Sequence, residues 1–380
     1  MPHTAINYDN TAGNVNTPVL RTELRLFKRL GHGSFGVAYL AEFRGRKLVV
    51  KLPVELLQTP EVRVHPRVNP DGRTLAEVIK PPNRIRQSVF ERARNAFRKE
   101  CQNAEQVLDS TVEHYMRANR GNGSNADALV GAPLLEGYLS AEDQAAIDEA
   151  RQRHRALPGY AHMHPIVHFD AQIPLLLSEP AQGTLEDLYV VIEDAPRLNA
   201  QWYEVARQLS DAIAFLRHPT VGMAHLDLKP DNVLYTHHPT TGRVHIWVGD
   251  YGQMDRANKR TTFVYGAPAF KPDDALALRM EQRGATCDDQ QLFAYYATIL
   301  DLIHFPTANN FNTRLLNLGN SIISVALPQM IKQRSSLVMY ASADLYQHVM
   351  APLLEPSVYV LGTLFERTRA WLYTMAPPQP

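Results

Sequence analysis

The sequence predicts an α+β fold, and three of its features lead to that prediction. Short strand-like runs lie near the N-terminus, one long amphipathic helix follows them, and the second half is mainly helical with a single strand pair. The chain has 380 residues, which is enough for more than one folding unit. Its 39 basic and 39 acidic residues cancel, so no overall charge favours nucleic acid or an anionic membrane as a partner.

The number of cysteines and the N-terminal residues indicate the cellular compartment in which we expect the protein. The two cysteines, Cys101 and Cys287, cannot form a disulfide framework, which is typical of a protein from a reducing compartment. The start, MPHTAINYDN, lacks a basic region followed by an apolar run. The apolar stretch LFAYYATILDLIHF is shorter than the ~18 residues a membrane span needs, and it carries Asp301. We expect an intracellular, soluble protein of the cytoplasm or nucleus, without membrane attachment.

The first part of the chain predicts an arm followed by a small sheet. Residues 1–20 are polar and rich in Asn and Thr, so we expect a loose arm. After Glu23, the runs LRLFKRL, VAYLAEF and KLVVKLP contain β-branched and aromatic residues and predict an antiparallel meander. Residues 58–83 hold five prolines and little periodicity, which predicts a loop or insertion.

A long helix and a second group of elements follow. Apolar residues spaced by three and four predict the helix: Phe90, Ala93, Phe97, Cys101, Ala104 and Leu108. Residues 119–139 predict a linker, and Ser140 begins an expected inserted helix that runs to about Arg155. HPIVHFD and IPLLLSE predict two strands, and the chain after Gly183 is mainly helical except for the strand pair NVLY and VHIWVGD.

A glycine-rich segment lies between the first two predicted strands. In a dinucleotide-binding fold a helix follows such glycines, but here the chain continues as VAYLAEF and turns back at Gly45, which predicts a strand–turn–strand flap. Glycines allow backbone N–H groups to approach phosphate oxygens closely. We therefore expect a nucleotide beneath the flap. Its residues are Gly31, His32, Gly33, Ser34, Phe35 and Gly36.

Lys51 ends the strand that follows the flap, where it can reach phosphates. An ammonium group at that position needs a carboxylate to hold it, and the long helix offers two, Glu100 and Glu105. We favour Glu100, because position 109, one turn after Glu105, is Asp and suits a core-facing stripe poorly.

The segment HLDLKPDN carries the strongest chemical signal. Asp227 is a candidate base for a hydroxyl, Lys229 a cation for a moving phosphoryl group, and Asn232 a neutral oxygen ligand for a hard metal ion. Asp250, in Asp-Tyr-Gly at the end of the strand VHIWVG, can meet the same metal as Asn232.

In their order and spacing, these motifs resemble those of eukaryotic-type protein kinases of the Ser/Thr type, from about Glu23 to near Tyr373. The resemblance implies a bilobal fold, with a small antiparallel sheet and one main helix in residues 21–178 and a larger, mostly helical lobe in residues 179–376. The segments near 58–83 and 119–156 would be insertions in the first lobe.

The resemblance also implies the roles of individual residues. Lys51 would bind the α- and β-phosphates of ATP and pair with Glu100. Asp227 would position and deprotonate the substrate hydroxyl, and Lys229 would stabilise the γ-phosphoryl group. Asn232 and Asp250 would hold Mg²⁺, or Mn²⁺ in its place. The implied partners are ATP and protein substrates; no oligomeric state follows.

Further positions matter through the same resemblance. Ala38 and Val49 would roof the adenine, as a small-for-large exchange of the usual pair that keeps the volume. Pro180 has no N–H to give, so we align Glu179 with the first hinge residue and take Ala181 as the adenine donor. Ser178 becomes the small residue behind the pocket.

The segment from Gly266 to Asp274 resembles the end of an activation segment. Asp274 replaces the usual Glu, which puts the usual salt bridge from that position to an Arg in doubt. Asp289 resembles the buried Asp that braces the catalytic loop. Leu226 replaces the Arg that would read an activation-loop phosphate, so we expect the unphosphorylated protein to be active. In the competing interpretation, a basic residue of the segment receives a phosphate at Thr261 or Thr262; the candidates are Arg256, Lys259 and Arg260.

Two other classes of function compete with an active kinase. A pseudokinase or scaffold would be supported by loss of Lys51, Asp227, Asn232 or Asp250, and all four are present. Small-molecule phosphotransferases of the choline or aminoglycoside type share the catalytic loop but typically lack this flap and the Gly266–Pro272 segment. The divergent motifs and insertions also resemble kinases encoded by large DNA viruses, the herpesvirus group among them, which would place the protein in the host cell.

Overall fold

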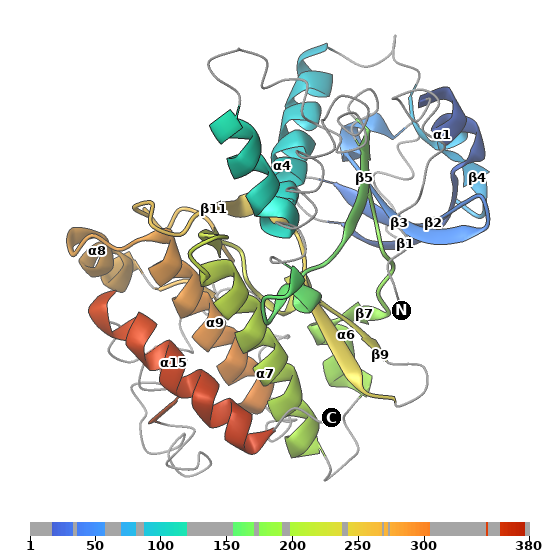
Figure 1. Ribbon diagram of the computed structural model, residues 1–380. Helices are drawn as coiled ribbons and strands as arrows, with labels where there is room; N and C mark the ends of the chain where they lie inside the picture. The colour runs from blue at the N-terminus through green and yellow to red at the C-terminus, as the bar shows by residue number, and fades with distance from the viewer. Residues whose placement is uncertain are drawn as a thin grey trace. The chain divides into compact units, whose positions relative to one another are not determined.

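The computed structural model describes residues 17–32, 36–57, 70–80, 87–119, 155–170, 175–191, 198–237, 242–267, 270–272, 274–304, 347–348 and 358–376. The chain divides into two compact units. The first comprises Met1–His154 with His164–Pro180, and the second comprises Arg155–Met163 with Ala181–Pro380. Helices and small antiparallel sheets occur together, which confirms the α+β class (Figure 1).

The first unit contains a six-stranded sheet in the order β4-β1-β2-β3-β6-β5, in which every neighbouring pair is antiparallel. Its strands are β1 (Arg25–His32), β2 (Val37–Phe43), β3 (Arg46–Leu52), β4 (Arg73–Thr74), β5 (Ile166–Asp170) and β6 (Leu175–Ser178). Its helices are α1 (Thr17–Glu23), α3 (Leu75–Val78) and α4 (Gln87–Asn119), with the 3₁₀ turn η1 (Val54–Leu56).

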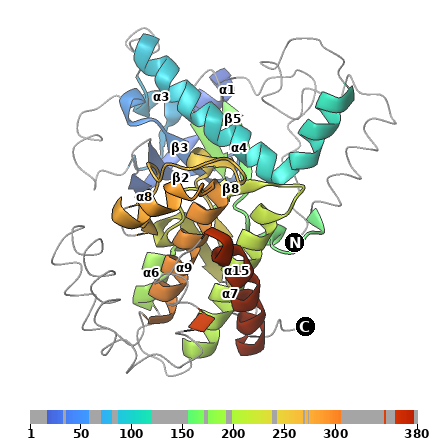
Figure 2. The same ribbon diagram turned by 90° about the vertical axis from the view of Figure 1, so that its left-hand side faces the viewer.

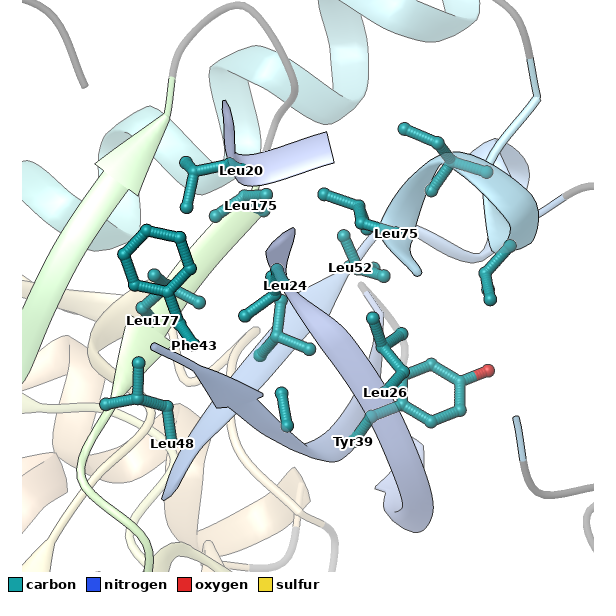
Figure 3. Close-up of a cluster of buried hydrophobic side chains, with 14 of the residues drawn as sticks. Leu20, Leu24, Leu26, Tyr39, Phe43, Leu48, Leu52, Leu75, Leu175 and Leu177 are labelled. Carbon is teal, nitrogen blue, oxygen red and sulfur yellow. The ribbon is translucent and has the colours of Figure 1, made fainter. Parts of the chain in front are cut away.

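The predicted meander of β1, β2 and β3 is confirmed. Arg44 and Gly45, between β2 and β3, both have positive φ angles of 50° and 79°, as a two-residue hairpin turn with the correct twist requires. Every second residue of β2 is buried, so one face of the strand belongs to the core. Figure 3 shows that core, in which leucines from several elements lie together with Tyr39 and Phe43.

Two segments expected to lie outside the folded part of the first unit belong to it in part. Residues 17–20 were expected in a loose arm, but they open helix α1, whose Leu20 is fully buried in the core (Figure 3). Within the expected loop 58–83, β4 pairs with β1, and the backbone N–H of Thr74 donates to the Glu77 carboxylate to cap α3. In both places buried leucines outweigh the polar or proline-rich surroundings. Residues 1–16, 58–69 and 81–86 and the helix expected at 140–154 lie outside the described residues.

Helix α4 packs against β5 and β6 in the first unit. It spans 33 residues, and Phe97, Cys101 and Ala104 of the predicted stripe are buried. Phe97 and Cys101 contact Leu176 of β6. This contact sets the rotation of the helix about its axis and hence the direction in which Glu100 points.

The second unit is mostly helical, as the sequence predicts. Its helices are α6 (Leu185–Val191), α7 (Leu198–Arg217), α8 (Asp274–Gln282), α9 (Cys287–His304) and α15 (Val358–Met375). Its strands are β7 (Gly183–Thr184), β8 (Met223–His225), β9 (Val233–His237), β10 (Val244–Val248) and β11 (Met254–Arg256), and its 3₁₀ turns are η5 (Tyr160–His162), η6 (Pro230–Asn232) and η7 (Tyr251–Gln253). The antiparallel sheets are β10-β9-β7 and β11-β8. Helices α7, α9 and α15 lie side by side (Figures 1 and 2).

A buried carboxylate joins α7 to α15. Asp211 of α7 accepts hydrogen bonds from Arg207 on the same helix and from Arg369 and Tyr373 of α15, at distances between 2.7 and 3.1 Å. Two guanidinium groups therefore compensate one buried charge. This cluster links α7 to α15. None of the described helices is both long enough and apolar enough to cross a lipid bilayer.

Candidate active site

In the first unit, the structure pairs Lys51 with Glu100. The Lys51 ammonium donates to both carboxylate oxygens of Glu100, at 2.9 and 2.8 Å, and lies 5.9 Å from the centre of the Phe97 ring. Glu100 is buried, and the Lys51 side chain keeps 23% of its surface exposed. The ammonium group is thus fixed by a buried partner and still reachable from solvent. The side chain of Glu105, the alternative partner, lies outside what the structure describes.

The open face of the sheet in the first unit carries both predicted adenine contacts. Ala38 lies directly opposite Lys51, and Val49 lies two residues before Lys51 on the same strand. Side chains two residues apart point to the same face, so Ala38, Val49 and Lys51 share one face. That face is only partly buried, whereas the opposite face of β2 and β3 forms the core. A partly exposed apolar surface therefore lies next to an ammonium group.

The last glycine of the flap has a packing role. A Cβ at Gly36 would lie 2.7 Å from the Leu52 carbonyl oxygen and 3.1 Å from the Phe97 ring, so a larger residue would force the flap away from β3. Gly31 has open space around it. Gly33, Ser34 and Phe35, and the side chain of His32, lie outside the described residues.

The predicted hinge is held by a buried histidine that the sequence reasoning missed. His164 Nε2 donates to the Glu179 carbonyl oxygen at 2.8 Å, and the Glu179 carboxylate forms an ion pair with Arg46. Burial lowers the pKa of His164 to about 4, so its ring is neutral. Ser178 lies opposite Val49 on the neighbouring strand. In the second unit, the backbone N–H of Ala181 has no acceptor among the described residues.

In the second unit, two side chains of the segment HLDLKPDN converge on the Asp227 carboxylate. Asn232 Nδ2 donates to the backbone oxygen of Asp227 at 2.6 Å and to its Oδ2 at 3.1 Å, and the Lys229 ammonium lies 3.4 Å from the same Oδ2. The Asp227 and Lys229 side chains retain 12% and 24% of their surface. Oδ2 is therefore engaged and Asp227 remains accessible to an incoming group.

His225 connects this loop to the Asp-Tyr-Gly segment. Its Nδ1 accepts from the Asp227 N–H at 3.2 Å, so its Nε2 carries the proton that is donated to the Gly249 carbonyl at 2.8 Å. The backbone N–H of Gly249 donates to the Asn232 carbonyl at 2.9 Å. Two hydrogen bonds on opposite sides of Gly249 thus fix the residue that precedes Asp250.

Asp250 itself adopts an unusual backbone conformation. Its φ of 60° and ψ of 72° lie in the left-handed region, which a non-glycine residue adopts at a cost of about 1–3 kcal/mol. Such conformations persist where the surroundings impose them, and they concentrate at functional sites. Here the buried Tyr251 and the pairing of β11 with β8 hold the chain on the far side of Asp250.

Asn232 and Asp250 offer oxygen ligands suited to a hard cation. Because Asn232 uses its Nδ2 on Asp227, its Oδ1 is the atom that remains for a ligand, and no described residue donates to it. The structure describes no cluster of three or more His, Cys, Asp or Glu side chains that could hold a metal by themselves. One carboxylate and one amide oxygen nevertheless fit Mg²⁺, which keeps waters and takes oxygens from substrate phosphates.

Glutamines, and not Asp289 as expected, hold the candidate catalytic loop. Asp289 accepts from the N–H and hydroxyl of Thr286, at 2.8 Å each, and so caps α9. Instead, Gln291 Oε1 accepts from the His225 N–H at 2.7 Å, and Gln290 Nε2 donates to the Leu226 and Tyr265 carbonyls at 3.4 and 2.8 Å. The signal that sequence reasoning could have used is a pair of amides directly before an apolar helical run.

Several further positions lie in or beside the segment that was compared with an activation segment. Leu226 is buried with Ala224 and Cys287 and forms part of a small apolar cluster. Thr261 is also buried, and its hydroxyl donates to Gln290 and accepts from the Phe263 N–H, whereas Thr262 is exposed. Asp274 opens α8 and forms no ion pair within the described ranges. Nearby in the sequence, Asp288 at the start of α9 forms an ion pair with Arg217 of α7 at 3.0 Å.

No protein-family model matches this chain, and no curated protein matches its sequence. No relative therefore supplies a function, and the side chains themselves must indicate it.

Proposed function

We propose that the protein is a protein kinase that transfers the γ-phosphoryl group of ATP to Ser and Thr hydroxyls of protein substrates. The observation that carries the proposal is the arrangement around Asp227, in which Lys229 and Asn232 engage one carboxylate oxygen and His225 ties the loop to Gly249. A carboxylate held in this way can orient a hydroxyl and accept its proton. Phosphoryl transfer depends mainly on such positioning and on electrostatic stabilisation.

The two compact units would be the two lobes of the kinase. The Lys51–Glu100 pair supports a phosphate-binding role in the first unit, because a buried carboxylate fixes an ammonium that stays accessible. The shared face of Ala38 and Val49 supports an apolar contact for a base. In the second unit, Asn232 and Asp250 would hold Mg²⁺, which would supply charge neutralisation to the phosphates.

Lys229 supports the preference for aliphatic hydroxyls. In the family that the sequence resembles, a Lys two residues after the catalytic Asp accompanies Ser and Thr substrates. Its ammonium, 3.4 Å from Asp227 Oδ2, would meet the transferring group at the carboxylate that holds the hydroxyl. A peptide array with Ser, Thr and Tyr acceptors tests the preference, and dominance of Tyr peptides would overturn it.

The decisive experiment is phosphate transfer from radiolabelled ATP to a degenerate peptide library, with wild-type protein, Asp227→Asn and Asp250→Asn. Removing a positioned general base typically costs about 10²–10⁴-fold. Both variants should lose nearly all transfer, and Asp227→Asn should still bind ATP. Asp231→Asn, on an exposed neighbour of the same loop, is the matched control and should retain activity. Wild-type turnover in Asp227→Asn would refute the proposal, as would transfer only to small-molecule alcohols or amines supplied in parallel.

A further inference from the structure

A basic surface in the second unit has no role in the chemistry described above. Three exposed arginines form it, Arg260 in the segment after β11, Arg279 near the end of α8, and Arg283 in the turn that follows α8. We refer to these three residues as the arginine surface. Figure 1 shows α8 at the outer edge of its unit.

Backbone contacts bring the three arginines together. The chain around Arg260 runs antiparallel to the chain around Thr286, with a bridge between these residues and a hydrogen bond of 3.0 Å from the Thr261 N–H to the Ala285 carbonyl. As a result, the Arg260 guanidinium lies across Gly284, where an added Cβ would be 3.2 Å from its Nη2. Arg283 is the next residue to Gly284.

Arg279 continues the surface along α8. The Arg283 N–H donates to the Arg279 carbonyl at 3.3 Å, so the two residues are one helical turn apart and lie on the same side. Gly284 has a φ of 85°, and this left-handed residue ends the helix and turns the chain toward α9. The surface is thus built from a helix end and a paired segment whose backbone is hydrogen-bonded.

No described carboxylate pairs with the arginine surface. Lys259, the neighbouring cation, lies 2.5 Å from Asp255, but Arg260, Arg279 and Arg283 form no ion pair within the described part of the chain. From Arg256 to Ala267 the sequence contains three basic residues and no acidic one, although the whole chain is neutral. Three exposed arginines whose backbones lie close together, and which pair with no described carboxylate, suit an anionic partner, because each guanidinium can donate paired, charge-assisted hydrogen bonds.

The neighbouring residues favour a peptide as that partner. Thr261 and Phe263 are buried and anchor the segment, while Val264 and Tyr265 are 70% and 50% exposed. Large apolar side chains held outward from a fixed backbone offer contact area to a peptide. The zero net charge of the chain gives no long-range attraction for a polyanion such as nucleic acid.

We propose that the arginine surface binds an acidic segment, rich in Asp and Glu, of the protein substrate. The inference rests on the proposed kinase function, since the surface adjoins the part of the chain that resembles the end of an activation segment. It deepens that function by assigning acidic proteins as the substrate class. The carboxylates would pair with guanidinium groups that the folded chain leaves accessible.

The test measures peptide binding without nucleotide. A fluorescent peptide with one Ser among Asp and Glu residues is titrated with phosphatase-treated full-length protein, beside a peptide with Asn and Gln in their place. We expect the acidic peptide to bind at least about tenfold more tightly, and the Arg260→Gln, Arg279→Gln, Arg283→Gln triple variant to lose that difference. Each single variant should weaken binding about three- to tenfold, and added salt should weaken wild-type binding more than that of the triple variant.

Arg367→Gln is the matched control, an exposed arginine of α15 that has no ion pair among the described residues. It should bind like wild type. Equal losses in Arg367→Gln and the triple variant would overturn the proposal, as would tighter binding of a single-stranded oligonucleotide than of the acidic peptide. If the triple variant fails to fold, the single variants and their salt dependence carry the test.

Two measurements separate this proposal from neighbouring explanations. ATP hydrolysis by the triple variant, measured without peptide, should equal that of wild type. If the wild-type protein lacks ATP hydrolysis but binds the acidic peptide, only the proposed kinase function is refuted. Mass spectrometry before and after phosphatase treatment shows whether Thr262 carries a phosphate. The affinity for the acidic peptide is measured on both samples. If phosphate on Thr262 blocks the acidic peptide, the occupant of the surface is the chain itself, and the proposal is wrong.

Discussion

The ring of His225 donates from Nε2 to the carbonyl oxygen of Gly249, at 2.8 Å, while its other nitrogen accepts from the Asp227 N–H. One buried side chain therefore positions both the candidate base and the residue before the candidate metal ligand Asp250. We regard His225 as a positioning residue.

His225→Gln should retain much of the activity, because a glutamine amide can still donate toward Gly249. His225→Asn should keep an acceptor for the Asp227 N–H but lose the link to Gly249, and we expect kcat to fall at least about tenfold, since an unpaired buried group costs about 1–3 kcal/mol. Steady-state kinetics and thermal unfolding distinguish positioning from a general loss of stability. Equal kcat in the two variants would contradict the positioning role.

The adenine contacts can be tested as a pair. Ala38→Val should overfill the ligand face, which typically costs about 1–3 kcal/mol, and Val49→Ala should leave a gap. Each single variant should raise the KM for ATP, and the double variant should recover toward wild type because the two side chains lie diagonally across neighbouring strands. A double-mutant cycle on KM provides the measurement, and strictly additive losses would show that the two residues do not share a ligand.

The two threonines after Arg260 should behave differently. Thr261→Ala should destabilise the segment, because its buried hydroxyl bonds both Gln290 and the Phe263 N–H. The loss should be about 1–3 kcal/mol, measured by chemical unfolding. Thr262→Ala should be neutral in stability and, since Leu226 cannot bind a phosphate, also in peptide phosphorylation. A hundredfold fall in the activity of Thr262→Ala, matched by phosphatase treatment of wild type, would show a phosphorylation switch instead.

Stability should depend on pH through His164. Burial lowers its pKa to about 4 from 6.5, so between these values the unfolded chain binds a proton that the folded chain does not. The free energy of unfolding should therefore fall as the pH is lowered from about 6.5 to 4, by up to about 3 kcal/mol from this residue. Urea unfolding of His164→Gln across that range should show a smaller pH dependence. His218→Gln, at the end of α7, is the control, and an equal change in slope there would contradict the assignment.

Tyr39→Phe should leave the free energy of unfolding unchanged or raise it. The Tyr39 hydroxyl is buried in the core of the first unit and has no hydrogen-bond partner among the described residues (Figure 3). A buried unpaired polar group costs about 1–3 kcal/mol, and phenylalanine keeps the ring while removing that group. Chemical unfolding gives the result. A loss above about 1 kcal/mol would mean that the hydroxyl has a partner in the folded protein.

The elements that the sequence predicted correctly depend on near neighbours in the chain. The β2–β3 hairpin follows from alternating apolar residues around Arg44 and Gly45, and α4 follows from an apolar stripe at helical spacing. The order and spacing of Lys51, Asp227, Asn232 and Asp250 likewise stand in the sequence, so the chemical hypothesis did not require coordinates.

Contacts between distant segments decided the rest. The packing of Phe97 on Leu176 turns Glu100 toward Lys51, 49 residues away, and Gln291 reaches the His225 backbone across 66 residues, where the sequence pointed to Asp289. Leu20 and Thr261 lie next to polar residues in the sequence, but tertiary packing buries both side chains. No local pattern predicts these outcomes, because the free energy of burying a side chain or pairing an amide depends on which distant surface the fold brings to it.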